Sequence, residues 1–237
     1  LSILTGYCFA YFYVNDLKTK PNHPSKPWFK AALFFNVLSS LGTFYLAYMM
    51  VTKNLQQHAY LGSVYFFLHF QYSGWFFFAI VGLVIDRFSG FKNFHYQPAT
   101  FKYFSAACIP AYFLFAVILQ LLGLLMLVRM VLRHLFQIRS EWPFAVKWLL
   151  GLAFLALVIK LMLQAGSVFP EISKLAFGFR SIVIAYLHLV LLAFTTLFLL
   201  GYLLLCGHLP YGKRSVFALV AISAGVFANE FVLMVQG

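Results

Sequence analysis

The chain has 237 residues, of which 63% are hydrophobic and only 9% are charged. Soluble domains carry about 25% charged residues, so this composition excludes an ordinary water-soluble enzyme and a disordered tail. The formal net charge is +12, but the charges fall in short segments between apolar runs, as they do in membrane proteins. We therefore expect the lipid bilayer as the main partner, together with other membrane subunits, and no nucleic acid.

Seven apolar segments follow one another along the chain. A helix needs about 20 apolar residues to cross roughly 30 Å of hydrocarbon. A leading run at 1–14 is too short, and full spans are predicted at 29–51, 60–85, 104–128, 144–164, 179–203 and 215–236. None of these runs shows the alternation of membrane β-strands. The predicted fold is all-α: a single polytopic transmembrane helical bundle over 1–237, with six full spans plus one truncated N-terminal span.

The chain begins inside an apolar run at Leu1, and we expect a fragment that lacks upstream helices. Lysine and arginine are slightly more numerous on the side that holds the connection between the first two segments. Positive residues favour the cytoplasmic side of a membrane. We therefore expect this side of the protein, and its C-terminus, to lie in the cytoplasm.

The span 29–51 carries a stripe of small and polar residues. Asn36, Ser39, Ser40 and Thr43 follow i, i+3, i+4 and i+7 spacing, with Gly42 beside them. Such a stripe lets neighbouring helices approach closely and form hydrogen bonds. We expect it to serve packing rather than binding.

The span 60–85 contains the first intramembrane histidine. Tyr65, His69, Tyr72 and Ser73 share one helical face, and Gln71 lies beside them. A neutral imidazole inside a helical bundle is a common axial ligand of haem iron and also handles protons. His69 is therefore a candidate metal ligand, Tyr72 a candidate cofactor-binding residue and Gln71 a candidate intramembrane polar residue.

The next two spans contain fewer candidate functional residues. The span 104–128 is predicted to run on through 129–139 as an interfacial helix with cations among the headgroups. In the span 144–164, Lys160 lies about four residues from the end. We expect its flexible stem to reach the headgroups, although it is also a candidate for an intramembrane polar path.

The span 179–203 places Arg180, Ile184 and His188 on one face. An arginine can pair with a haem propionate while an imidazole ligates the iron, and an internal hydrogen-bond network explains the same face. His69 and His188 are predicted about 10 Å apart in depth, which disfavours one haem ligated by both. In the span 215–236, Glu230 is predicted to be neutral, paired with a cation or part of a proton path.

Two stretches resemble known bacterial membrane proteins: YFFLHFQYSGWFFF at 65–78 and IAYLHLVLLAF at 184–194. They are similar to an uncharacterised, Bacteroidetes-type family of multi-span proteins and, more remotely, to haem-copper oxidase subunit I and NnrS-type haem proteins. This resemblance implies a location in the bacterial inner membrane. It also implies that His188 matches the second histidine of an HxH motif. Tyr186 stands in place of the first, and the copper-ligand motif is absent, so oxygen reduction by this segment alone is not implied.

Three hypotheses for the function follow, and whether the chain is an enzyme stays open. The first is a membrane protein that binds haem b through His69 and His188, with Arg180 and Tyr72 nearby, for electron transfer or redox sensing. The second is a transporter or channel segment with a polar path. The third is a scaffold without a cofactor. A comparison of the first three segments with the last three shows no internal repeat, which places the transporter second.

Overall fold

A computed structural model describes residues 2–19, 22–54, 56–110, 114–172 and 180–236. The elements in these ranges are all helices, and six of them are long and apolar enough to cross a membrane. The prediction of an all-α, multi-span membrane protein is therefore confirmed. Contacts divide the chain into two compact units, Leu1–Cys108 and Ile109–Gly237, each of which we describe by itself.

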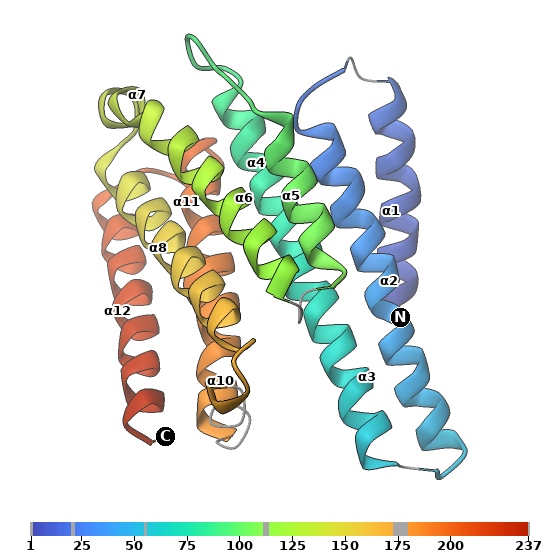
Figure 1. Ribbon diagram of the computed structural model, residues 1–237. Coiled ribbons are helices and arrows are strands. Elements are labelled where there is room, and N and C mark those ends of the chain that lie inside the picture. The colour runs from blue at the N-terminus through green and yellow to red at the C-terminus, as the bar shows by residue number, and fades with distance from the viewer. Residues whose placement is uncertain (1, 20–21, 55, 111–113, 173–179, 237) are drawn as a thin grey trace. The chain divides into compact units, whose positions relative to one another are not determined.

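Unit 1 is built around a pair of long helices (Figure 1). One is α2, and the other is a continuous rod in which α3, a π-helical segment η1 and α4 follow without a break. The rod packs against α2 along all three of its parts, while α1 and α5 pack on α2 from other sides. The bounds are α1 Ser2–Thr19, α2 Lys26–Val51, α3 Gln57–His69, η1 Phe70–Phe76, α4 Phe77–Phe88 and α5 Pro98–Cys108.

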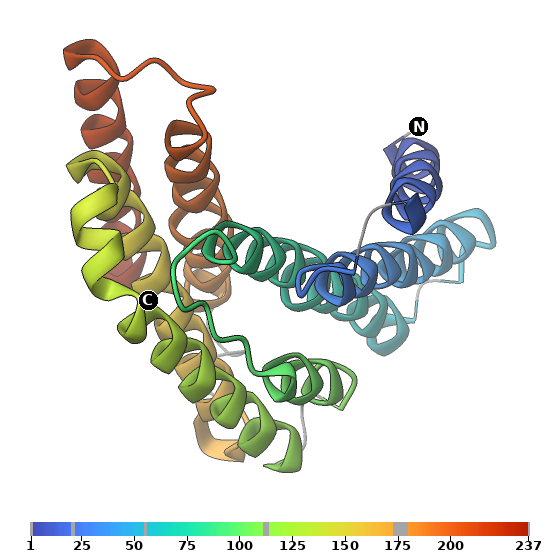
Figure 2. The same ribbon diagram turned by 90° about the horizontal axis from the view of Figure 1, so that it is seen from above.

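Unit 2 also contains a long helix, α8, packed against a rod with a π-helical centre. The rod consists of α10, η2 and α11, and α12 packs against α10, η2 and α8. The connection from α11 to α12 crosses one end of this unit, as the view from above shows (Figure 2). The bounds are α6 Leu114–Arg133, α7 Leu135–Glu141, α8 Phe144–Gly166, α10 Arg180–His188, η2 Leu189–Thr196, α11 Leu197–Leu205 and α12 Lys213–Gln236.

The single span predicted at 104–128 is wrong, because this segment forms the end of α5 and most of α6. Pro110 has no backbone N–H and prevents the helix from continuing. The predicted extension of this span is also interrupted, at His134, where α6 has ended and α7 begins. The ring of His134 donates from Nδ1 to the carbonyl of Met130 at 2.8 Å, which satisfies a carbonyl group in the last turn of α6.

The small and polar stripe of α2 packs against neighbouring helices, as predicted: against the rod and against α1. Ser39 and Ser40 are buried and donate their hydroxyl groups to carbonyls of their own helix. A Cβ atom built on Gly42 would lie 2.6 Å from the backbone oxygen of Ser63 in α3. Only glycine permits this approach, so Gly42 sets the spacing between α2 and α3.

Trp28 forms the centre of an aromatic core in unit 1. It is 0% exposed and has ring contacts with Phe77, Phe78 and Phe101. Its Nε1 donates to the hydroxyl of Tyr96 at 2.9 Å. Burial raises the pKa of Tyr96, and the hydrogen bond from Trp28 lowers it by less. Tyr96 therefore stays neutral near pH 7 and ties the connection after α4 to the start of α2.

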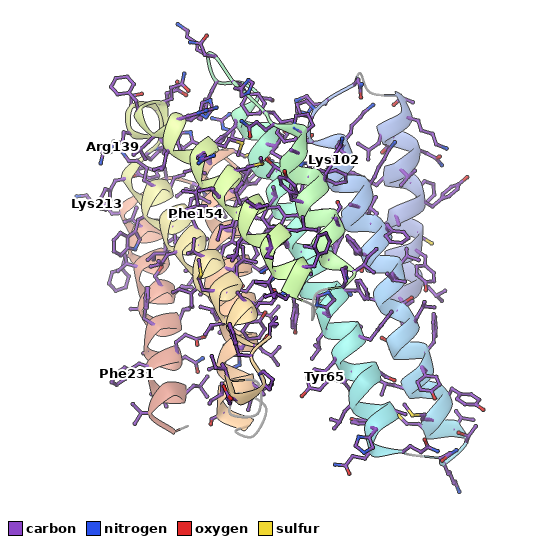
Figure 3. All side chains as sticks on the ribbon, in the orientation of Figure 1. Tyr65, Lys102, Arg139, Phe154, Lys213 and Phe231 are labelled. Atoms are coloured by element: carbon purple, nitrogen blue, oxygen red, sulfur yellow. The ribbon has the colours of Figure 1, made fainter. Side chains whose placement is uncertain are left out.

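The outer surface of α12 is apolar. Phe227 and Phe231 are 51% and 65% exposed, and Phe231 projects away from the helix (Figure 3). Only 17% of this span is buried inside the structure. Such a surface suits contact with lipid chains, because apolar side chains lose nothing by facing hydrocarbon.

Candidate functional site: two intramembrane histidines

His188 is the last residue of α10 and directly precedes the π-helical segment η2. The hydroxyl groups of Thr195 and Thr196 each donate to the carbonyl five residues earlier, at 2.8 Å. These bonds follow the i to i−5 spacing of a π-helix and give a local reason for the wider turn. Single π-helical turns inside longer helices are frequent at functional sites, so the position of His188 beside one makes it a strong site candidate.

The ring of His188 is oriented by a side chain of α12. Its Nδ1 lies 2.9 Å from Nδ2 of Asn229. A carboxamide that turns by 180° presents its oxygen instead and then accepts from Nδ1–H. The Asn229 amide can thus satisfy either tautomer of the ring. Among the residues that the structure describes, Nε2 of His188 has no hydrogen-bond partner.

Glu230 lies beside this pair. Its Oε1 atom is buried and has no hydrogen-bond partner within the described part of the chain. Its carboxyl group interacts electrostatically with His188. Buried polar atoms are almost always hydrogen-bonded, so this oxygen needs an explanation such as a bound proton or a ligand. His188, Asn229 and Glu230 form what we call the His188 cluster.

His69 occupies a similar place in unit 1 but has a different partner. It is the last residue of α3, and the π-helical segment η1 starts at Phe70. Its Nε2 donates to the backbone carbonyl of Cys108 at 2.8 Å. Cys108 ends α5, so this carbonyl belongs to the helix end that lacks intrahelical donors. The nitrogen that usually ligates haem iron is thus already engaged.

The other predicted residues of unit 1 do not gather around His69 as one polar group. Gln71 donates from Nε2 to Oδ1 of Asn36 at 3.3 Å, across to α2, while its Oε1 is buried without a partner among the described atoms. The ring of Tyr72 stacks on Phe76, with centroids 6.1 Å apart. The Gln71 contact joins the rod to α2, and the Tyr72 contact lies within the rod.

The structure describes the side chain of Lys160 but not that of Arg180. Lys160 was expected to extend its stem to the headgroups, but its side chain is 1% exposed and its Nζ donates to Oε1 of Gln164 at 3.4 Å. It is buried because neighbouring helices of unit 2 pack against α8. The backbone of Arg180 begins α10, but its side chain lies outside the described part of the structure.

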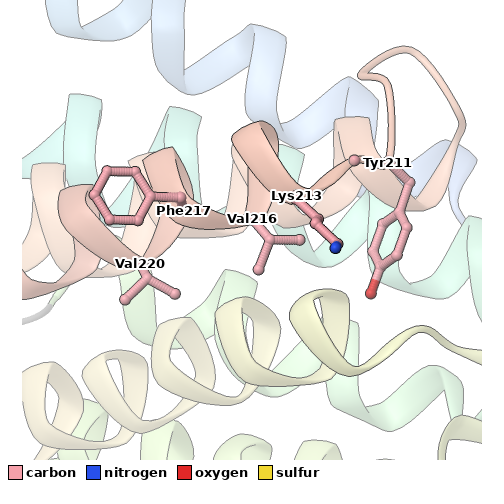
Figure 4. A pocket seen from close by; sticks show the side chains of 6 residues that line it. Tyr211, Lys213, Val216, Phe217 and Val220 are labelled. Carbon is pink, nitrogen blue, oxygen red and sulfur yellow. The ribbon is translucent and has the colours of Figure 1, made fainter.

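The described residues contain no group of three or more histidine, cysteine, aspartate or glutamate side chains that could hold a metal ion alone. A hollow of about 710 Å³ lies at the start of α12 (Figure 4). Its lining residues all belong to the single segment 211–220, with Tyr211 and Lys213 at one end and Phe217 and Val220 towards the other. Because one short segment supplies the whole lining, it is an open surface feature rather than an enclosed site.

Together these observations define a multi-pass membrane protein with a histidine beside a π-helical turn in each unit. The chain matches no family model, no curated protein and no solved structure. The sequence analysis did not include Asn229 among the candidate site residues. Its position next to Glu230 was the available signal, since an amide can orient an imidazole.

Proposed function

We propose that this protein binds one haem b through His188 and serves electron transfer or redox sensing in a bacterial inner membrane. The observation that carries the proposal is the orientation of His188, with Nδ1 held by Asn229 and Nε2 without a partner in the described chain. Histidines that ligate metals usually donate from their second nitrogen to an acceptor, and Asn229 becomes such an acceptor when its amide turns to present the oxygen to Nδ1–H. Haem supplies an iron that exchanges single electrons.

His188 and His69 differ in how well they fit haem as ligands of its iron. In the His188 cluster, an Asn229 oxygen that accepts from Nδ1–H leaves a lone pair on Nε2 for the iron. His69 does not fit through Nε2, because that atom donates to Cys108. We therefore propose a single histidine ligand from this chain and assign no ligand role to His69. An additional membrane subunit, or a part of the protein beyond this chain, would supply a second ligand.

Absorbance of the purified protein tests the proposal. The protein is expressed with adequate haem supply, and the Soret band is measured per mole of protein. We expect His188→Ala to abolish the band. His58 is exposed on α3 and provides the matched control, so His58→Ala should leave the band unchanged. An absent band in the wild-type protein, or an unchanged band in His188→Ala, would refute the proposal.

A second candidate function is proton movement through the membrane, with the C-terminus in the cytoplasm. It is favoured by the buried, unpartnered Oε1 atom of Glu230 and the proximity of this carboxyl group to His188. Carboxylates and imidazoles that lie near one another inside a membrane can form a proton relay. Proton flux into liposomes should fall in Glu230→Gln and not in Glu141→Gln, since Glu141 is exposed at the end of α7. Equal flux in both variants would remove this candidate.

A further inference from the structure

We infer that the chain contains two copies of one helical module with divided roles. In the first copy His69 braces the end of a helix, and in the second copy His188 faces a ligand. The first role is independent of any cofactor. The second rests on the proposed function.

The two units have the same internal plan. In each, a long helix, α2 or α8, packs against a rod that contains a π-helical segment. In each, the π-helical segment begins directly after a histidine. The helix that follows the rod, α5 or α12, packs on both the rod and the long helix. It also supplies the hydrogen-bond partner of the histidine, 39 residues later in unit 1 and 41 residues later in unit 2.

Residues of the two rods correspond at a constant offset of 119 positions. Both rods contain a Leu-His pair, a small residue five positions after the histidine, and a glycine thirteen positions after it. The pairs are Leu68 with Leu187, His69 with His188, Gly74 with Ala193, and Gly82 with Gly201. The offset also relates Phe78 to Leu197, which are 0% and 1% exposed.

The glycine pair has the same packing role in both copies. A Cβ atom on Gly82 would lie 2.8 Å from Cε1 of Phe29 in α2. A Cβ atom on Gly201 would lie 2.9 Å from Cδ2 of Leu150 in α8. In both units a glycine at the same position of the rod therefore permits close contact with the long helix. One residue match is weak evidence, but matched π-helical turns, histidines and close-contact glycines support a common module.

A comparison of the first three apolar segments with the last three does not show this repeat, because it pairs segments that do not correspond. The correspondence runs instead from α2 to α8, from the first rod to the second, and from α5 to α12. The expectation of no internal repeat is therefore corrected by a shift of one helix. At this offset, several aromatic residues of the first rod align with aliphatic residues of the second, which makes the similarity hard to see in the sequence.

The partners of the two histidines separate their roles. A backbone carbonyl only accepts, so the bond from His69 to Cys108 fixes a proton on Nε2 and holds the end of α5. The side-chain amide of Asn229 can donate or accept, and Glu230 adds a carboxyl group beside it. The hydrogen bond of His69 stabilises a helix end, whereas the contacts of His188 leave its imidazole able to bind a ligand.

Thermal unfolding and absorbance of the complete chain in detergent test this division. His69→Ala leaves a helix-end carbonyl without its donor, and we expect the apparent Tm to fall by about 2–10 °C. His69→Gln should recover at least half of this loss, because its Nε2 can donate to the same carbonyl. His188→Ala should lower the Tm of the cofactor-free protein by less than half as much. The exposed control, His58→Ala, should leave Tm unchanged.

The outcomes distinguish this inference from the proposed function. Equal losses of Tm in His69→Ala and His188→Ala, or no recovery in His69→Gln, would overturn the division of roles whether or not haem is bound. A Soret band that is lost in His69→Ala and retained in His188→Ala would overturn it as well. A wild-type protein without a Soret band would refute the haem proposal, while the two Tm comparisons would still decide the role of His69.

Discussion

The close contact between α2 and α3 at Gly42 provides a quantitative prediction. In Gly42→Ala, the new Cβ atom would lie 2.6 Å from the backbone oxygen of Ser63, whereas ordinary contacts begin at 3.4 Å, so the helices must separate by about 0.8 Å. Overpacking of this kind costs about 1–3 kcal/mol, and alanine returns up to about 1 kcal/mol through its helix propensity. We expect a net loss of up to about 3 kcal/mol, which lowers Tm by up to about 12 °C in a protein of this size.

Gly62 is the matched control for this measurement. It lies on α3, in the same helix pair, but it is exposed and a Cβ atom there would have nothing within 4 Å. Gly62→Ala should therefore leave the Tm of the detergent-solubilised protein unchanged or raise it slightly. If both alanine variants unfold at the same temperature, the close approach at Gly42 does not contribute to stability and the reasoning is refuted.

Three further substitutions have expected outcomes in the same unfolding assay. Gly201→Ala should destabilise less than Gly42→Ala, because the contacted atoms of Leu150 belong to a side chain that can turn away; a larger loss would contradict this. Tyr96→Phe should lower stability by about 1–3 kcal/mol and shift the fluorescence of Trp28, because the fully buried indole N–H loses its acceptor. Unchanged emission and Tm would contradict this hydrogen bond. Lys160→Met should be neutral or stabilising, since an apolar side chain of similar length avoids burying an ammonium group, and a marked loss would show that this charge is needed.

The sequence was sufficient to predict the fold class because the bilayer imposes a strong constraint. Any segment that crosses hydrocarbon must satisfy its backbone hydrogen bonds internally, so long apolar runs become helices. The packing role of the stripe on α2 could also be predicted, because Gly42, Ser39 and Ser40 lie on one helical face in the pattern of small and polar residues that is typical of helix packing. The break after Cys108 was missed, although Pro110 is visible in the sequence, because the apolar run continues on both sides of it.

The site was less predictable because its partners lie on other helices. The sequence identified His69 and His188 by their residue type, which is rare and costly in hydrocarbon. It could not show that one ring meets a backbone carbonyl and the other an amide, because these contacts span 39 and 41 residues. Lys160 was misjudged for the same reason, since its burial depends on the helices that cover α8.

The π-helical turns explain how both histidines reach the helix that follows. A π-helical turn adds about one residue to the local repeat and so rotates the downstream part of the rod relative to the upstream part. The rod can then pack Gly82 or Gly201 against its long helix while the histidine, upstream of the turn, faces a different neighbour. A regular α-helix would tie these two directions together. The wider turn separates the packing face from the histidine face, so His69 and His188 can have different partners while both rods pack on their long helices.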